Sequence, residues 1–152
     1  LLADKKAPLI ADAGAGAGFS GITAKILWPQ AEFVLIDSLS KRCAFMEWVC
    51  AKLELSAIKA ARLRLGQDKS GIQADAVLER AMGQLEDIAG ACASVAAPGG
   101  YFIAYRSSPQ DAGAQLSPLL ENAAAPDLPL SYRLPDEEQF RHFAVFRRKA
   151  LG

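Results

Sequence analysis

Three glycines at alternate positions carry the clearest chemical signal in this sequence. Gly14, Gly16 and Gly18 follow an acidic residue, Asp12, and precede a segment with helical periodicity. Glycine allows a tight turn and a close approach of the backbone to a ligand, and the start of a helix offers unpaired N–H groups. A second acid, Asp37, follows the next apolar run, about 20 residues on, where nucleoside cofactor sites carry a ribose-binding carboxylate. The pattern favours a nucleoside-type cofactor site over an ordinary tight turn.

The glycine spacing and the preceding acid bear on which cofactor is bound. A dinucleotide fingerprint reads G-x-G-x-x-G and places a pyrophosphate at the helix N-terminus. This loop instead reads Gly14-x-Gly16-x-Gly18 and follows Asp12. A carboxylate there repels a phosphate and suits a ligand with a positive amine or sulfonium centre. S-adenosylmethionine therefore fits better than NAD, and an NAD-binding Rossmann protein remains the alternative.

The elements around these residues alternate between short apolar runs and segments of helical period. Strands are expected at residues 8–12, 33–36, 58–65, 74–78, 101–105, 130–134 and 143–146. Helices are expected at residues 22–28, 45–53, 85–97 and 110–125. Ser38 or Ser40 can cap the second helix, and Pro98-Gly99-Gly100 ends the third. This alternation predicts an α/β fold of the Rossmann type, with a mostly parallel sheet covered by helices on both faces and ligands at the carboxyl ends of its strands.

Length and charge point to a single domain over residues 1–152. The chain is 51% hydrophobic, and its 17 Lys and Arg balance 17 Asp and Glu. Zero net charge argues against a domain that holds nucleic acid by bulk electrostatics, so that any contact with RNA should be local. The basic candidates for such contact are Lys41, Arg42, Lys59, Arg62, Arg64, Lys69, Arg141, His142, Arg147, Arg148 and Lys149, with an ordinary solvated surface as the alternative for each cluster.

The cysteines and the apolar runs give further expectations. Cys43, Cys50 and Cys92 form no CxxC pair, which predicts buried thiols rather than a disulfide framework or a metal site. No apolar run reaches the length of a membrane span, and the N-terminus lacks the pattern of a signal peptide. We therefore expect a cytoplasmic monomer without metal. The chain opens at Leu1 rather than Met, which suggests a missing upstream element.

Four segments together resemble a known family. Residues 12–21, 36–46, 79–81 and 98–100 read Asp-Ala-Gly-Ala-Gly-Ala-Gly-Phe-Ser-Gly, Ile-Asp-Ser-Leu-Ser-Lys-Arg-Cys-Ala-Phe-Met, Glu-Arg-Ala and Pro-Gly-Gly. They are similar to the bacterial 16S ribosomal RNA guanine-N7 methyltransferases, also known as glucose-inhibited division protein B. The combined glycine loop and Asp-Ser-x-x-Lys-Arg-x-x-Phe motif is far more specific than either part. The resemblance runs from Pro8 to Arg148.

The resemblance implies a class I methyltransferase fold with a late antiparallel strand, S-adenosylmethionine as cofactor, and ribosomal RNA or the small ribosomal subunit as partner. Gly14 and Phe19 would contact the methionine portion of the cofactor, Asp37 the ribose, and the Leu65-Gly66 turn the adenine, with Arg80 at the mouth of the pocket. The full set of expected cofactor-binding residues is Asp12, Gly14, Gly16, Phe19, Asp37, Ser38, Leu65, Gly66 and Arg80.

The chemistry implied for this family needs no general base, because guanine N7 offers a lone pair in the neutral base. Catalysis would rest on in-line positioning, with Arg80 and Arg106 binding the guanine O6 edge or a flanking phosphate. The alternatives are a salt bridge from Arg80 to Glu79 or Asp75 and a solvated strand end for Arg106.

The sequence departs from the family pattern at several points. Ser20, Gly66 and Arg106 stand where the family usually has Pro, Glu and Lys. Loss of the acid at position 66 leaves Gln67 or Asp68 to substitute for it, and the family's helical N-terminal segment is expected to be absent. A non-catalytic relative that still binds the cofactor is therefore the second alternative.

Overall fold

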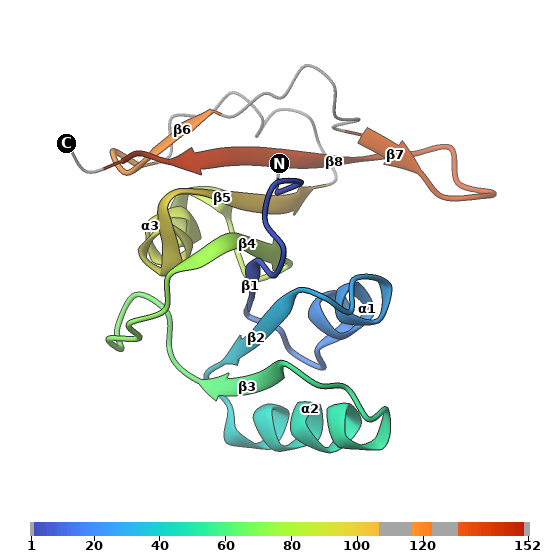
Figure 1. Ribbon diagram of the computed structural model, residues 1–152. Coiled ribbons are helices and arrows are strands. Elements are labelled where there is room, and N and C mark those ends of the chain that lie inside the picture. The colour runs from blue at the N-terminus through green and yellow to red at the C-terminus, as the bar shows by residue number, and fades with distance from the viewer. Residues whose placement is uncertain (1, 107–116, 123–130, 151–152) are drawn as a thin grey trace.

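One mixed β-sheet organises the structure, a computed structural model that describes residues 2–106, 117–122 and 131–150 (Figure 1). Its strands lie in the order β3-β2-β1-β4-β5-β8-β6, and β7 pairs with β8 beside this path. The strands are β1 (Leu9–Ala13), β2 (Glu32–Asp37), β3 (Ile58–Arg62), β4 (Ala74–Arg80), β5 (Ala96–Arg106), β6 (Leu120–Asn122), β7 (Ser131–Arg133) and β8 (Phe140–Arg148). The helices are α1 (Phe19–Leu27), α2 (Ser40–Lys52) and α3 (Leu85–Val95).

Strands β1 to β5 are parallel, and β8 is antiparallel to β5. The chain runs from β1 outward through β2 to β3 and then crosses to β4 on the other side of β1. The strand order thus reverses between β1 and β4, which is where open α/β sheets bind their ligands. The expected α/β architecture with a late antiparallel strand is confirmed.

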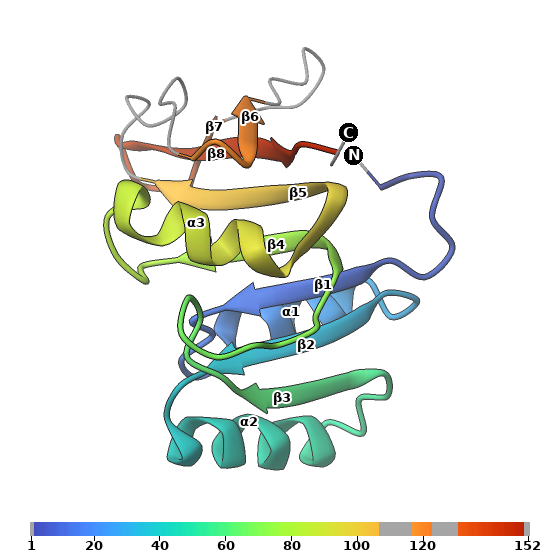
Figure 2. The same cartoon turned by 90° about the vertical axis from the view of Figure 1, so that its left-hand side faces the viewer.

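The helices cover both faces of the sheet because the central strands are apolar on both faces (Figure 2). On β2, Val34 and Ile36 belong to the core cluster under α3, whereas Leu35 packs with Cys43, Met46 and other residues of α1 and α2. Successive side chains of a strand point to opposite faces. The same alternation decides below which strand-end side chains can meet.

The three thiols lie in these two layers. Cys92 of α3 is in the cluster beneath that helix, and Cys43 and Cys50 of α2 are in the cluster with Leu35. Burial raises the pKa of Cys92 to about 12 and that of the other two thiols above its ordinary value. The expectation of buried thiols is confirmed, and these side chains are poor nucleophiles.

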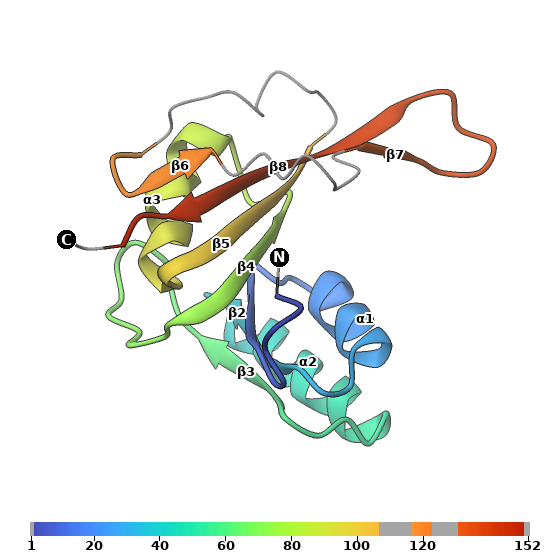
Figure 3. The same ribbon diagram turned by 45° about the horizontal axis from the view of Figure 1, so that its top comes forward.

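Strand β8 is longer than the four residues expected from the sequence. It pairs with β5 over most of its length, with β6 near its carboxyl end and with β7 near its amino end (Figure 3). The expected helix over 110–125 is wrong where the structure describes it, since Leu120–Asn122 is strand β6. Residues 110–116 and 123–125 of that expected helix lie outside the described residues. The strand expected at 130–134 corresponds to β7.

Two local expectations are also wrong. Pro98-Gly99-Gly100 does not separate α3 from the next strand, because β5 already begins at Ala96 and contains all three residues. The β4–β5 register shifts there, from Ala74↔Ala96 to Ala76↔Tyr101, so that the extra residues form an irregularity within the strand. The N-cap of α2 is Leu39, without a side-chain cap from either serine.

None of the helices in the described part of the chain is long and apolar enough to cross a membrane.

Candidate functional site

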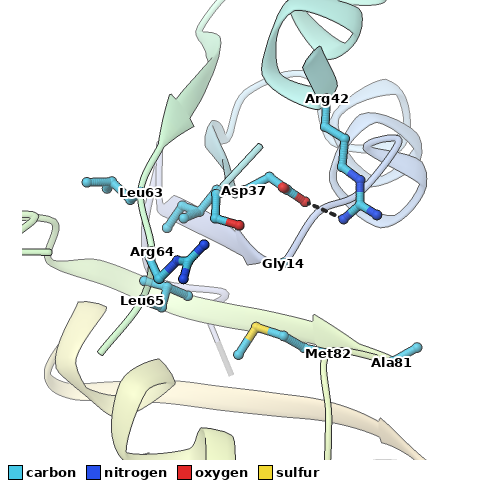
Figure 4. A pocket seen from close by; sticks show the side chains of 10 residues that line it. Gly14, Asp37, Arg42, Leu63, Arg64, Leu65, Ala81 and Met82 are labelled. Atoms are coloured by element: carbon cyan, nitrogen blue, oxygen red, sulfur yellow. Dashed lines mark hydrogen bonds and ion pairs between the residues drawn. The ribbon is translucent and has the colours of Figure 1, made fainter. Parts of the chain in front are cut away.

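A cavity of about 320 Å³ opens at the carboxyl edge of the sheet, beside the point where the strand order reverses. It is formed by the ends of strands β1 to β4 and the loops after them (Figure 4). Its lining residues are Gly14, Ile36, Asp37, Ser38, Arg42, Leu63, Arg64, Leu65, Ala81 and Met82. This volume is within the range of small-molecule sites.

Asp37 is the buried carboxylate of this cavity and organises two of its walls. One oxygen, Oδ1, accepts a hydrogen bond from the Leu39 N–H at 2.9 Å, at the start of α2. The other, Oδ2, accepts from the Gly16 N–H at 3.0 Å and from Arg42 Nη1 at 3.2 Å. Burial acts to raise the pKa of Asp37, but these hydrogen bonds outweigh it and hold the pKa below its ordinary value. The carboxylate therefore stays ionised in the cavity.

Asp12 lies behind the glycine loop rather than in the cavity. Its side chain is 2% exposed, and Oδ2 accepts a hydrogen bond from the Gly21 N–H of α1 at 2.8 Å. Burial, offset in part by this bond and by the charge of Arg80, raises the pKa of Asp12 from 3.8 to about 6. The helix passes so close that a Cβ at Gly21 would lie 2.2 Å from Leu35 Cδ2 and 2.9 Å from the Asp12 carboxylate. Asp12 thus caps the first turn of α1 from the sheet.

Glu79 is the third strand-end carboxylate that holds a loop, and it is fully buried. Its Oε1 accepts a hydrogen bond from the Met82 N–H at 2.7 Å, and its Oε2 pairs with Arg106 Nη1 at 2.7 Å. Met82 lines the cavity opposite Gly14, whose φ is +64°, and a Cβ at Gly14 would lie 2.8 Å from Met82 Cγ. The loop after β4 and the glycine loop therefore meet without space for a side chain between them.

The two arginines expected at the substrate lie in different surroundings. Arg80 is exposed, and its guanidinium carbon lies 4.7 Å from the ring centroid of Phe19 at the start of α1. The side chain of Arg106 is 11% exposed and bonds Glu79 and the Tyr105 carbonyl. The solvated strand end considered for Arg106 is wrong.

The salt bridges considered for Arg80 are also wrong. Glu79 bonds Arg106, and Asp75 instead bonds Lys5 and the Leu9 N–H. Glu79 shares the α3 side of β4 with Val77, whereas Arg80 faces α1. The side chains of the two arginines therefore point to opposite faces of the sheet.

The expected cofactor residues divide into two groups. Those that line the cavity are Gly14, Asp37, Ser38 and Leu65. The residues that do not line the cavity are Asp12, Gly16, Phe19, Gly66 and Arg80. Of these, Gly16 is connected to the site through its hydrogen bond to Asp37. Phe19 and Arg80 contact each other. The direct cofactor contacts of both groups stay predictions.

Sequence reasoning missed several lining residues, above all Arg42, Arg64 and Met82. Neither Gln67 nor Asp68 lines the cavity in place of the family's acid; Asp68 is exposed and accepts a hydrogen bond from the Arg64 N–H at 2.8 Å. The position of Met82, just after a strand of the parallel sheet, is the signal that could have identified it. Arg42 and Arg64 were assigned to the RNA-contact clusters because their charge alone does not distinguish the two roles.

Part of the basic surface expected from the sequence is engaged within the chain. Arg141 bonds Glu137 at 2.7 Å, Arg147 bonds the Gly99 carbonyl, and Arg148 bonds the Ala96 carbonyl. Arg147 also lies 6.0 Å from the ring centroid of Tyr101. Among the described residues, no group of three or more His, Cys, Asp and Glu side chains could hold a metal ion.

Comparison with known proteins identifies close sequence relatives. A family model described as GidB, rRNA small subunit methyltransferase G, matches residues 1–120. The protein named ribosomal RNA small subunit methyltransferase G from Macrococcus caseolyticus is 32% identical over 151 residues, which cover 95% of this chain and 63% of that relative. The protein of the same name from Lacticaseibacillus paracasei is 36% identical over 145 residues, 90% of this chain and 59% of that relative. The chain thus spans about three fifths of the length of these relatives.

Solved structures show the same fold at low identity. Precorrin-6y C5,15-methyltransferase from Geobacter metallireducens superposes with a TM-score of 0.63 at 14% identity, covering 96% of this chain and 82% of that one. Coclaurine N-methyltransferase, solved with N-methylheliamine and SAH, gives a TM-score of 0.60 at 10% identity over 66% of this chain and 31% of that one. The glycine loop, the strand-end Asp37 and the match over residues 1–120 agree: the chain has a Rossmann-like class I methyltransferase fold and belongs to the GidB family, rRNA small subunit methyltransferase G.

Proposed function

We propose that the chain binds S-adenosylmethionine in the cavity at the carboxyl edge and transfers its methyl group to guanine N7 of 16S ribosomal RNA. The observation that carries this proposal is the position of Asp37. Its ionised carboxylate lies in the cavity at the end of β2 and accepts a hydrogen bond from the glycine loop. It follows that loop by about 20 residues, which is the spacing of a ribose-binding acid. The names of the relatives supply the ribosomal RNA substrate, and the guanine N7 position follows from the family resemblance.

The residues of the cavity fit a nucleoside cofactor with a positive sulfonium centre. Gly14 brings backbone to the cavity wall without a side chain, and Leu63 and Leu65 offer an apolar surface to a base. The Gly21 N–H at the start of α1 is already bonded to the Asp12 carboxylate, so an anionic pyrophosphate finds a negative group there. This arrangement favours S-adenosylmethionine over a dinucleotide.

S-adenosylmethionine, when bound, supplies an electrophilic methyl group. The chain has to orient the acceptor base and exclude competing positions, because guanine N7 needs no proton removed before it attacks. In this proposal Arg80, which is exposed beside Phe19, binds the O6 edge of guanine or a flanking phosphate.

The proposal is tested by calorimetry and by labelled methyl transfer with the same protein. S-adenosylhomocysteine is expected to bind with about micromolar affinity, worth roughly 8 kcal/mol. Labelled methyl should then appear in 16S ribosomal RNA, either free or in small subunits. Strand cleavage specific for N7-methylguanine should locate the label at a guanine. Binding of NAD and not of S-adenosylhomocysteine would support the dinucleotide alternative. Cofactor binding without any transfer to either RNA substrate would identify a non-catalytic relative.

Replacing Arg80 by alanine is expected to lower the rate of methyl transfer by about 100-fold, the size of effect that loss of one charged donor at a reacting group produces. An unchanged affinity for S-adenosylhomocysteine would assign Arg80 to the substrate alone, and a lowered affinity would also support its expected contact with the cofactor. Folding should suffer little, because an exposed cation–π pair contributes about 0.5–1 kcal/mol. Arg133→Ala is the matched control, since Arg133 makes a similar contact with Phe140, at 5.9 Å, outside the cavity. Wild-type turnover in the Arg80→Ala variant would contradict a substrate role.

A further inference from the structure

The strongest unassigned feature is the buried ion pair of Glu79 and Arg106. Glu79 is fully buried and Arg106 is 11% exposed, with 2.7 Å between the two charged atoms. The pair faces the core under α3, where burial and the charge of Glu79 raise the pKa of Cys92 and the charge of Arg106 lowers it. Removing two charges from water is costly, and an apolar pair of similar volume often gives equal or greater stability. The pair is thus better explained by what it positions than by the stability of the core.

Glu79 positions the backbone of the loop after β4, which lines the cavity. Oε1 accepts the Met82 N–H at 2.7 Å, while Oε2 is held by Arg106. Arg106 in turn bonds the Tyr105 carbonyl at the end of β5. The loop after β4 is therefore tied, through one carboxylate, to the neighbouring strand.

The position of Met82 decides the shape of the cavity. Its side chain lies in the lining against Gly14, where a Cβ would come within 2.8 Å of Met82 Cγ. A movement of this loop would change the space beside the glycine loop, because Met82 occupies the place where a side chain at Gly14 would lie. Ala81, which has a positive φ of 60°, lines the cavity in the same loop.

We propose that Glu79 and Arg106 form a positioning pair that fixes the loop at residues 81–83 and thereby sets the affinity of the cavity for the cofactor. In this proposal Arg106 acts through Glu79, as a positioning residue. This inference rests on the proposed function for its effect on cofactor binding, whereas its effect on the loop is independent of it.

Three variants separate positioning from stability. Glu79→Gln keeps an oxygen that can accept the Met82 N–H, and Glu79→Met does not. The double variant Glu79→Met with Arg106→Met also removes the charge that Glu79→Met leaves buried and unpaired. Glu32→Gln, an exposed carboxylate at the amino end of β2, is the matched control. For each variant we would measure the thermal midpoint, the affinity for S-adenosylhomocysteine, and hydrogen exchange at the Met82 amide.

Glu79→Met is expected to weaken binding of S-adenosylhomocysteine by about tenfold, as loss of one positioning hydrogen bond would, and to speed exchange at Met82. The double variant should regain thermal stability but keep both defects. Glu79→Gln keeps one acceptor oxygen but not the ion pair with Arg106, so its affinity should fall between those of the wild type and Glu79→Met. In turnover assays the Met variants should show a raised KM for S-adenosylmethionine with little change in kcat.

A purely structural pair gives a different pattern. Affinity and Met82 exchange would then follow the thermal midpoint, and the double variant would regain both, which would overturn the proposal. If the wild type and Glu32→Gln bind no S-adenosylhomocysteine, the proposed function fails instead. The exchange measurement needs no cofactor, and an unchanged Met82 rate in Glu79→Met would refute the positioning role in either case.

Discussion

Replacing Asp37 by alanine is expected to abolish cofactor binding in the micromolar range, with a loss of about 100-fold or more. The variant would lack the proposed contact of the carboxylate with the ribose hydroxyls, and a hydrogen bond to a charged group contributes about 1.5–3 kcal/mol. The substitution also frees the Gly16 and Leu39 N–H groups, so that the glycine loop and the start of α2 lose a common anchor. Calorimetry with S-adenosylhomocysteine and denaturant unfolding measure the two effects separately.

Asp68→Ala is the matched control for this prediction. Asp68 also accepts one backbone N–H, that of Arg64, but it is exposed and lies outside the cavity lining. It should therefore change affinity far less than Asp37→Ala. The salt bridge from Arg42 contributes little to either result, because the Arg42 side chain is 55% exposed. A folded Asp37→Ala variant with wild-type affinity would show that the ribose lies elsewhere.

Replacing Asp12 by asparagine should remove a pH dependence of folding stability. The pKa of Asp12 is raised to about 6 in the folded chain, against 3.8 ordinarily. An acid with a raised pKa stabilises the fold fully below pH 4, and this contribution is lost as the pH rises through about 6. A shift of about two units corresponds to roughly 3 kcal/mol. Between pH 4 and pH 7 the unfolding free energy of the wild type should fall by about this amount relative to the variant.

Asparagine is the appropriate replacement because its side-chain oxygen can still accept the Gly21 N–H, which the carboxylate accepts at 2.8 Å. Unfolding in urea at several pH values, with wild type and variant in parallel, isolates this group from the other carboxylates of the chain. A constant difference between the two proteins across this range would mean that Asp12 has an ordinary pKa. Urea unfolding of the Asp37→Ala variant over the same pH range should not show this loss of pH dependence, since the pKa of Asp37 is lowered and not raised.

The sequence was most informative where local pattern and tertiary structure agree. Strands such as Glu32–Asp37 are apolar without a break because both of their faces are covered, and the chain marks their ends with acids. The helix expected over 110–125 is wrong at residues 120–122 because local pattern and tertiary structure disagree there. Alanine content favours a helix there, but Leu120 is buried in the core and its backbone pairs with Arg148 of β8. Pairing between distant segments outweighed local propensity, which no single-sequence pattern shows.

The candidate site was partly predictable for a similar reason. Strand ends and glycines identified the edge of the sheet, Gly14 and Asp37, and the family resemblance added Ser38 and Leu65; all four line the cavity. Sequence alone could not tell that Asp12 faces α1 or that Arg106 faces Glu79, because one residue of register moves a side chain to the other face. It also could not separate the basic residues that enter the cavity from those at the surface.

The three buried cysteines allow local opening of the two core layers to be measured in the native chain. A thiol reagent reacts with the ionised form, so buried thiols with raised pKa values are labelled when the surrounding layer opens. Cys92 records opening of the layer under α3, and Cys43 and Cys50 record opening of the layer under α2. Labelling rates at the three positions would show whether the two layers open together or one at a time, without any engineered cysteine.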